Sequence, residues 1–279
     1  KQMESDCPEL FWFDFTGNIK WKTSGTKKNV VFLPHYIFTK EQTKQYDKKL
    51  KKNLALYLSY ADKKETEYEK AYTVYEHLTR RISYREGSKY NQNLISGMVN
   101  EETVCTGYAK SLQYIYQKMG IPCRMVYGRA NGQNHAWNLV QIEGADCYVD
   151  PTWGSNNQKM SKGFFGMTEE ELLRGHTLDQ GLKVPKCSSK KNNYYVRQNH
   201  YYRQFELGKI YNQLCEQKNQ GQISFQMGSR TEYEKAHRQL IADRKIFDLL
   251  KRVPGFGAKK MEVTYYTDRQ LYIMTFNFK

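Results

Sequence analysis

The chain lacks long apolar runs, paired cysteine motifs and clustered histidines, and each absence excludes a class of protein. No segment approaches the roughly 18 uninterrupted apolar residues of a membrane-spanning helix, so we expect no membrane span. The 6 cysteines include no C-x-x-C pair, which argues against a zinc ribbon and a thioredoxin-type site. His176, His200 and His237 are too isolated to form a metal site, so we expect neither a metal nor another cofactor.

Positive charge and aromatic rings, by contrast, are abundant. The 44 Lys and Arg residues oppose 29 Asp and Glu residues, so the formal net charge is +15 and the pI is about 9.3. Nucleic acid, an anionic membrane surface and an acidic wall polymer all attract such a polycation. The basic residues are scattered and no reader motif is present, so we expect a solvated basic surface and no specific nucleic-acid partner. The 23 Tyr and 13 Phe are too many for a disordered chain.

Hydrophobic spacing predicts the helices and strands of the first two thirds of the chain. An opening strand ends in a turn at Gly17-Asn18, and a second strand covers residues 30–33. Apolar residues spaced by three and four predict helices over residues 39–59, 65–81 and 104–119. Strand-like runs follow at residues 123–128, 135–142 and 147–151, and the chain then becomes irregular.

A basic, polar stretch at residues 186–193 is a candidate domain boundary. Beyond it the pattern predicts a helix, a strand, a second helix and a hairpin, at residues 204–217, 223–227, 231–251, and 261–266 with 270–278. The length allows one or two domains. We predict a core domain over residues 1–190, which includes an N-terminal strand and helix part, and a smaller α+β subdomain over residues 191–279.

Cys105 lies at the start of the helix predicted over residues 104–119. Free backbone N–H groups and the helix dipole stabilise an anion there, which lowers the pKa of a thiol and favours a nucleophilic thiolate. Gly107 and Ala109 keep bulk away from this end. A buried structural cysteine is the alternative interpretation of Cys105 taken alone.

His135 and Asp150 lie on two successive predicted strands that a short turn at Glu143-Gly144 joins. Pairing of Ile142 with Ala145 fixes the register and places Asp150 opposite Trp137. Because His135 and Trp137 are two residues apart on one strand, Asp150 and His135 become diagonal neighbours on one face. A histidine oriented by an acid and aimed at a thiol is the general arrangement of a catalytic triad.

Three blocks together resemble the signature of the transglutaminase-like superfamily of papain-fold cysteine enzymes. They are Val104-Cys105-Thr106-Gly107-Tyr108-Ala109, His135-Ala136-Trp137-Asn138 and Val149-Asp150-Pro151-Thr152-Trp153. The chain is most similar to the bacterial branch found in secreted or surface proteins of Gram-positive organisms. The resemblance implies an α+β papain-like core, in which the nucleophile helix packs on an antiparallel sheet. It also implies Cys105 as nucleophile, His135 as general base and Asp150 as the orienting acid.

Five other residues are candidates for contacting the substrate or an oxyanion. Upstream of Cys105, the side chains of Tyr90, Gln92 and Asn93 are candidate oxyanion donors, although an ordinary polar loop residue is the favoured interpretation of each one taken alone. Trp137 and Trp153 either flank a substrate channel or belong to the core. Gly154 departs from the pattern of the family, in which many members carry Asp at this position.

The leading functional prediction is thiol-dependent acyl transfer on a peptide or peptide-like amide. The Cys105 thiolate attacks the amide carbonyl to give a thioester, which water or an amine then resolves. We favour hydrolysis, as by a cysteine peptidase or amidase, over protein-glutamine transamidation, because bulk water competes well unless a site excludes it. The alternative belongs to another class of function. It is a catalytically idle surface module that binds an anionic cell-wall polymer or a partner protein.

The start of the chain bears on localisation. The first residues, from Lys1 onwards, do not resemble a signal peptide, and the chain opens on lysine rather than methionine. We therefore expect a processed or trimmed form whose signal segment is not in this sequence. With the resemblance, this predicts an extracellular or cell-surface protein.

Overall fold

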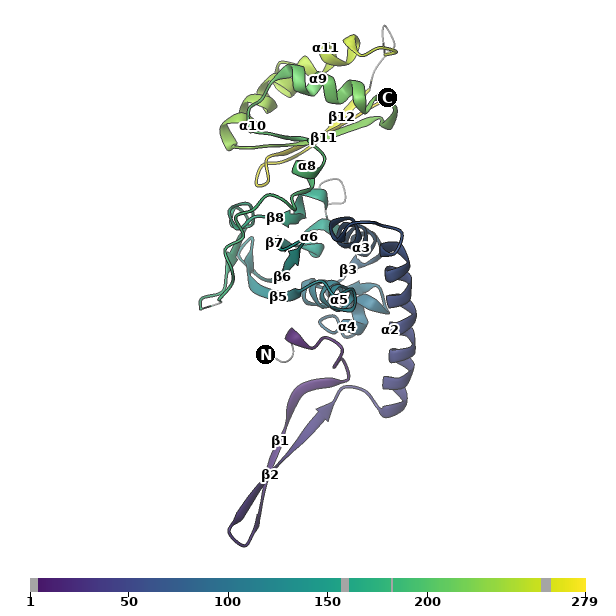
Figure 1. Cartoon of the computed structure of the whole chain (residues 1–279), viewed down its shortest axis with the longest axis vertical. Helices are drawn as coiled ribbons and strands as arrows, with labels where there is room; N and C mark the ends of the chain where they lie inside the picture. Colours follow the sequence, from purple (N-terminus) through teal and green to yellow (C-terminus); the bar gives the residue numbers. More distant parts are fainter. Residues whose placement is uncertain (1–4, 157–160, 182, 257–261) are drawn as a thin grey trace.

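The computed structural model describes residues 5–156, 161–181, 183–256 and 262–279, which are arranged along one long axis (Figure 1). A two-stranded hairpin extends from one end, a five-stranded sheet with helices beside it occupies the middle, and a second sheet with its own helices lies at the other end. No helix within these ranges has both the length and the apolar character needed to cross a bilayer.

The N-terminal hairpin consists of β1 (Phe13–Ser24) and β2 (Lys27–Tyr36). The turn predicted at Gly17-Asn18 is wrong, because β1 continues through both residues and turns after Ser24, where Gly25 has a φ of 60°. The pairing of the two strands shifts register between Phe13 and Gly17, and the glycine lies where the regular pairing resumes. A Cβ atom at Gly17 would lie 2.4 Å from the backbone oxygen of Leu33, so the close approach of the two strands requires glycine.

Two long helices follow the hairpin, α2 (Lys40–Ala61) and α3 (Glu67–Arg81), in agreement with the predicted helices. Each begins with a capping box, in which Thr39 exchanges hydrogen bonds with Gln42 and Thr66 with Glu69. The short α4 (Leu94–Met98) was not predicted, because five residues are too few to show a helical period. Next comes α5 (Cys105–Lys118), which matches the third predicted helix.

The middle sheet has the strand order β8-β7-β6-β5-β9 and is antiparallel throughout. Its strands are β5 (Cys123–Ala130), β6 (Gln133–Ile142), β7 (Ala145–Val149), β8 (Phe165–Met167) and β9 (His176–Leu178). The predicted register of β6 and β7 is confirmed, since Ile142 pairs with Ala145 and Asn138 with Val149. Glu143 and Gly144 both have positive φ angles, as a two-residue type I′ turn requires.

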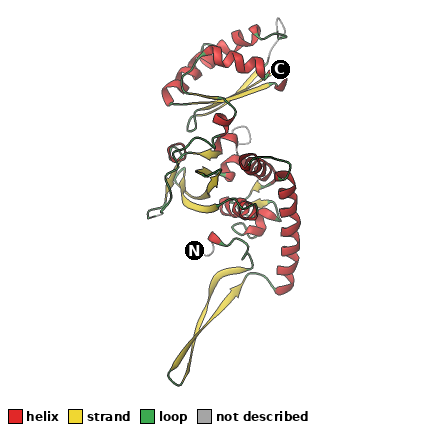
Figure 2. Cartoon of the chain, viewed as in Figure 1, coloured by secondary structure: helices red, strands yellow, loops and turns green. Residues whose placement is uncertain are grey.

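Helices α3 and α5 lie beside this sheet, and the long α2 forms the outermost layer (Figure 2). One hydrophobic cluster joins these helices to one face of the sheet, through residues such as Leu78, Leu112 and Val140. The predicted α+β class and the packing of the helix that begins at Cys105 on an antiparallel sheet are confirmed. The segment after Pro151 is more regular than predicted: it contains α6 (Pro151–Asn156), a 3-10 turn (Ser161–Phe164), β8, α7 (Glu169–Leu172) and β9.

The C-terminal sheet has the order β10-β11-β13-β12 and is covered by α9, α10 and α11. The bounds are α8 (Tyr194–Arg197), β10 (Tyr201–Tyr202), α9 (Leu207–Glu216), β11 (Gln222–Met227), α10 (Arg230–His237), α11 (Lys245–Arg252), β12 (Val263–Asp268) and β13 (Ile273–Phe278). The predicted helix over residues 231–251 is interrupted by a π-helical turn and by Arg244, whose φ is 57°. Met261, the predicted start of the hairpin, lies outside the described residues.

The two sheets are not independent of each other. Leu271 and Ile273, from the C-terminal hairpin, belong to the same buried cluster as Trp137 and Tyr148 from the middle sheet. The division into domains at residues 190 and 191 therefore stays a prediction.

Candidate active site

Cys105 is the first residue of α5, and Val104 occupies the cap position before it. Thr103 lies on the short strand β4 (Glu102–Thr103), which pairs with β3 (Ser83–Tyr84). A Cβ atom at Gly107 would lie 1.8 Å from the hydroxyl oxygen of Thr103, so this glycine lets the strand pack tightly against the first turn of the helix. Cys105 is half-buried and packs against Ala109, Met125 and Ala136.

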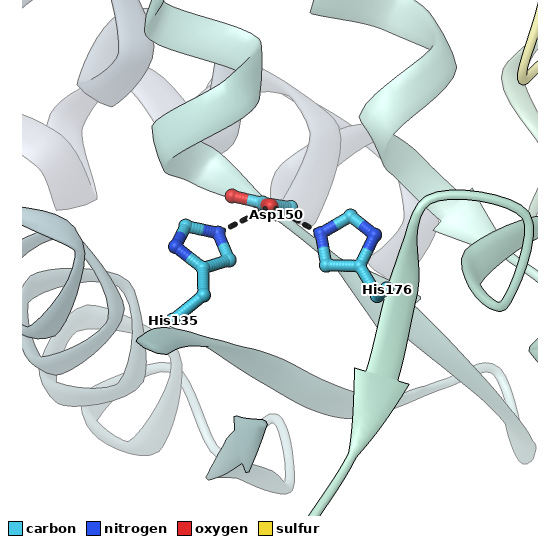
Figure 3. Close-up of side chains that lie close together, drawn as sticks. All are labelled: His135, Asp150 and His176. Carbon is cyan, nitrogen blue, oxygen red and sulfur yellow. Dashed lines mark hydrogen bonds and ion pairs between the residues drawn. The ribbon is translucent and has the colours of Figure 1, made fainter. Parts of the chain in front are cut away.

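Asp150 follows β7 directly and is completely buried. One carboxylate oxygen, Oδ1, accepts hydrogen bonds from the backbone N–H groups of Thr152 (2.9 Å) and Trp153 (3.0 Å) at the start of α6. The other oxygen, Oδ2, lies 2.8 Å from Nε2 of His135 (Figure 3). The predicted diagonal pair is therefore in contact, and the start of a helix helps to hold its acid.

His135 also lies close enough to Cys105 to lower the pKa of its thiol. Because Nε2 faces Asp150, Nδ1 is the ring nitrogen that remains for the sulfur, and Figure 3 shows it on the side of the ring away from Asp150. Asn138, three residues further along β6, donates a hydrogen bond of 3.0 Å to the backbone oxygen of Ala109. That bond joins β6 to α5 and so holds His135 beside Cys105.

The charges of the three groups support one another. Burial opposes the charged form of His135, but the negative charge and hydrogen bond of Asp150, with the contribution of Cys105, raise the pKa of His135 to about 10. Burial also opposes the charged form of Cys105, which by itself raises the pKa of the thiol. The interaction with His135 outweighs burial, so the pKa is lowered overall. Burial of Asp150 is outweighed by His135 and His176, which hold the pKa of its carboxyl far below the ordinary range.

His176 is a member of the site that the sequence did not reveal. It begins β9, and its Nε2 lies 3.0 Å from the same Oδ2 atom of Asp150 that binds His135 (Figure 3). Its Nδ1 lies 3.3 Å from the backbone oxygen of Leu172. No local pattern marks this residue, because it lies 26 residues beyond Asp150 on a strand of three residues.

His135, Asp150 and His176 are the group of side chains, among those the structure describes, whose donor atoms could surround one metal ion, since these atoms lie within 4.8 Å of one another. Both histidines, however, direct Nε2 at one carboxylate oxygen at 2.8 and 3.0 Å. Both Nε2 atoms and Oδ2 therefore already have hydrogen-bond partners. The arrangement fits a hydrogen-bonded His-Asp-His group better than an open metal site.

The two predicted tryptophans both pack against the histidines, but they differ in burial. Trp137 is fully buried in the cluster beneath the sheet, with its ring centroid 5.8 Å from that of His135, so it supports the site rather than contacting substrate. Trp153 is half-buried, and its ring centroid lies 4.4 Å from that of His176 and 6.1 Å from that of His135. Trp153 is therefore the one of the two that is partly open to solvent.

The upstream candidates belong to a loop that runs beside the start of α5. Within that loop, the backbone oxygen of Asn91 accepts a hydrogen bond of 3.2 Å from the N–H of Val104. Asn93 caps α4 and donates to the backbone oxygen of Phe11, so its side chain has a structural role. The Tyr90 ring packs against Phe38, with the centroids 4.8 Å apart. The exposed Gln92 lines a cavity of about 260 Å³ next to this loop.

Tyr84 is a second neighbour of Cys105 that the sequence analysis missed. It pairs with Thr103 across the β3–β4 bridge and is 42% exposed. Burial and the charge of Cys105 both raise the pKa of its hydroxyl. Tyr84 is therefore a partly exposed phenol on the two-residue bridge that leads to the start of α5.

The departure at Gly154 has a steric cause. A Cβ atom there would lie 2.0 Å from the hydroxyl oxygen of Tyr75, which donates a hydrogen bond of 2.6 Å to the backbone oxygen of Ser161. The tyrosine of α3 occupies the space that an aspartate at position 154 would need. The glycine therefore reflects helix packing in this chain and does not affect the contacts of Asp150.

A comparison with models of known protein families matches the middle of the chain. Residues 54–151 match the sequence model of the transglutaminase-like superfamily, a range that includes Cys105, His135 and Asp150 and ends before His176. The middle of the chain is thus a transglutaminase-like domain, and the match supports a thiol enzyme. No curated protein matches the chain significantly.

Three solved structures resemble part of the chain. The first, described as a TGase, has a TM-score of 0.36 and 15% identity over 48% of this chain and 44% of its own. The second, provisionally described as a cysteine protease of Cytophaga hutchinsonii, has a TM-score of 0.34 and 16% identity over 49% of this chain and 62% of its own. The third, provisionally described as a protease of Parabacteroides distasonis, has a TM-score of 0.30 and 12% identity over 49% and 36%. This chain thus covers less than two thirds of each of them.

Proposed function

We propose that the chain is a thiol-dependent acyl-transfer enzyme in which Cys105, His135 and Asp150 act as a catalytic triad. The observation that carries the proposal is the position of His135. Its Nε2 lies 2.8 Å from the buried Asp150, its other ring nitrogen faces away from that acid, and its charge lowers the pKa of the Cys105 thiol. Such a histidine takes the proton of the thiol and holds it as an imidazolium between two negative groups.

The first half of the reaction forms a thioester. The Cys105 sulfur attacks the carbonyl carbon of an amide, and the electron pair of the C=O bond moves onto oxygen. The backbone N–H of Cys105 lies at a helix start and is suited to stabilise this oxyanion, with Gln92 and Tyr84 as candidate second donors. His135 then gives its proton to the departing amine nitrogen as the C–N bond breaks.

In the second half, water resolves the thioester. His135 removes a proton from the attacking water, and the thiolate leaves as the C–S bond breaks. We favour water over an amine, and therefore hydrolysis of a protein or peptide over cross-linking, because the Cys105 side chain is only half-buried and bulk water competes well for an open thioester.

The pH dependence of Cys105 alkylation, followed by peptide mass spectrometry, tests the triad. An ordinary thiol titrates near about pH 8.5, whereas a thiolate paired with an imidazolium reacts well below pH 7. We expect fast labelling of Cys105 at pH 6 that is lost in His135→Ala. The half-buried Cys7 and Cys215 serve as references within the same sample.

The same experiment separates the enzyme from the idle surface module. Equal labelling profiles for Cys105 and the two reference cysteines would favour a protein that binds an anionic cell-wall polymer or a partner without catalysis. Rapid labelling would be followed by incubation with casein, with and without a primary amine: new N-termini indicate hydrolysis, and amine incorporation indicates transamidation.

We also propose an extracellular or cell-surface location, on the strength of the bacterial proteins that the chain resembles. Fractionation of cells that produce the full-length protein checks this, since recovery in the cytosol alone would contradict it.

A further inference from the structure

The hairpin of β1 and β2 carries large apolar side chains that remain exposed in the part of the chain that the structure describes. It extends away from the helices and the middle sheet (Figure 1). Trp21 is 71% exposed, Ile19 59%, Val30 57% and Phe32 50%. A two-stranded hairpin is marginally stable in water, and a contiguous apolar surface on it indicates a binding site.

The strand register places these four side chains on one face. Ile19 pairs with Phe32 and Trp21 with Val30, and residues two apart on a strand share a face. Lys20 and Lys22 alternate with them and therefore lie on the opposite face, where they are exposed. One face of the hairpin is thus apolar and aromatic, whereas the other combines lysines with the partly exposed Val31 and Leu33.

The charge on this part of the chain has one sign. Residues 15–40 contain five lysines, at positions 20, 22, 27, 28 and 40, and no aspartate or glutamate. Asp14 and Glu41 are the nearest acids along the chain. A partner for this surface must therefore be negatively charged as well as able to accept apolar side chains.

The apolar surface continues into a groove where the hairpin meets α2. Aromatic and aliphatic side chains line this groove, whose volume is about 730 Å³, together with Lys40 and Lys44 at the start of the helix; the aromatic ones are Trp12, Tyr36 and Phe38. Again no acidic side chain is among the lining residues. Hydrophobic walls beside two lysines fit an anionic headgroup together with the start of its acyl chain.

We propose that the hairpin and the adjoining groove dock on an anionic lipid surface, with Ile19, Trp21, Val30 and Phe32 in the interfacial region. Lys40 and Lys44 of the groove pair with lipid phosphates, and the long side chains of Lys20 and Lys22 extend past the edge of the two-stranded hairpin to reach the headgroups. A purely polar anionic polymer would leave the apolar face uncovered, and a second copy of the hairpin would bring like charges together. The inference does not depend on the triad, because none of these residues contacts Cys105, His135 or Asp150 in the described structure.

Sedimentation of the intact protein with lipid vesicles tests the proposal. We expect binding to vesicles of phosphatidylcholine that also contain phosphatidylglycerol, a blue shift of tryptophan fluorescence, and little binding to phosphatidylcholine alone. Raising the salt concentration weakens the binding, because screening reduces the attraction between lysines and phosphates.

Two variants separate the two faces of the hairpin. Ile19→Ser with Trp21→Ser removes apolar contact and is expected to lower vesicle affinity by about tenfold or more, which corresponds to about 1.4 kcal/mol. Lys20→Glu with Lys22→Glu is expected to lower vesicle affinity by a similar factor and to abolish the preference for anionic lipid. Tyr265→Ser, which changes an aromatic residue with 49% exposure on the C-terminal sheet, is the matched control and leaves binding unchanged.

Several outcomes would overturn the proposal. Absence of binding to both kinds of vesicle, or equal binding by the double serine variant, excludes the lipid surface. A wild-type dimer in light scattering that becomes a monomer in the double serine variant identifies a second copy as the occupant. Unchanged alkylation of Cys105 in each variant shows that the fold has survived and keeps failure of this proposal distinct from failure of the triad.

Discussion

At the scale of single residues, the protonation of His135 is coupled to folding. Its pKa is raised to about 10 in the folded chain, against about 6.5 for an unfolded histidine. Its contribution to stability is therefore fully present below about pH 6.5 and is lost as the pH rises towards 10. The lowered pKa of Cys105 acts in the opposite direction, so Cys105→Ser is the background in which the contribution of His135 can be isolated.

We expect the free energy of unfolding of Cys105→Ser, from denaturant titrations, to fall between pH 7 and pH 10 more steeply than that of Cys105→Ser/His135→Gln. The physical reason is that Asp150 stabilises the imidazolium of His135 in the folded chain, whereas the imidazolium has no such partner in the unfolded chain. Parallel pH profiles for the two variants would show that the histidine is not protonated at neutral pH.

His176 positions Asp150 and does not itself reach the thiol in the described contacts. Its Nε2 shares Oδ2 of Asp150 with His135 at 3.0 Å. We expect His176→Ala to slow Cys105 alkylation at pH 6 by about tenfold, because loss of a charge-assisted hydrogen bond is worth about 1.5 kcal/mol and lets the carboxylate rotate. His176→Gln keeps an N–H donor and is expected to recover most of the rate.

The pH profile of alkylation distinguishes positioning from a merely structural role. A shift of the profile in His176→Ala that His176→Gln restores supports positioning of the acid. Identical profiles for wild type and His176→Ala would mean that the two backbone N–H groups of α6 hold Asp150 without help.

The difference between His135 and His176 shows which contacts a sequence can reveal. A two-residue turn fixes the register of β6 and β7, so the contact of His135 with Asp150 follows from counting residues. His176 reaches the same oxygen through the pairing of β9 with β5, at the far edge of the sheet. Nothing in the local sequence determines that pairing, because tertiary packing of a three-residue strand decides it.

At the scale of elements, Gly154 reports how closely α6 packs against α3. We expect Gly154→Ala to lower the free energy of unfolding by about 1–3 kcal/mol, since its Cβ atom would meet the Tyr75 hydroxyl. Gly208→Ala, in α9 with open space around it, is the control and is expected to be neutral or slightly stabilising.

A second variant identifies the cause of that loss. Tyr75→Phe removes the oxygen closest to position 154, so Gly154→Ala should cost less in a Tyr75→Phe background than in the wild type. Strictly additive effects in chemical denaturation would instead place the strain within the backbone of α6.

Elements with a long apolar period were predicted well, and those stabilised by a single close contact were not. The stripes of α2, α3 and α5 extend over three or more turns, so their periodicity is unambiguous. Gly17-Asn18 has residue types that are typical of a turn, but Gly17 instead allows a close approach between two strands. That requirement becomes visible only when the pairing of the strands is known. Likewise α4, β8 and β9, of three to five residues each, are too short to show a period.

At the scale of the whole molecule, two buried clusters meet at the C-terminal hairpin. Phe276 belongs to the cluster between the second sheet and its helices, whereas Ile273, three residues earlier on the same strand, belongs to the cluster beneath Trp137. Both side chains are fully buried. This strand therefore offers a matched pair of positions for asking how far the C-terminal unit stabilises the candidate active site.

We expect Ile273→Ala to increase hydrogen exchange both in the C-terminal sheet and in peptides from β6 to β8, because it removes about 2–5 kcal/mol of buried contact from the shared cluster. Phe276→Ala should increase exchange in the C-terminal sheet alone. Equal effects of both variants on β6 to β8 would show one cooperative unit and contradict a boundary near residue 190. An effect of Ile273→Ala confined to the C-terminal sheet would mean that the active-site sheet keeps its structure without this contact.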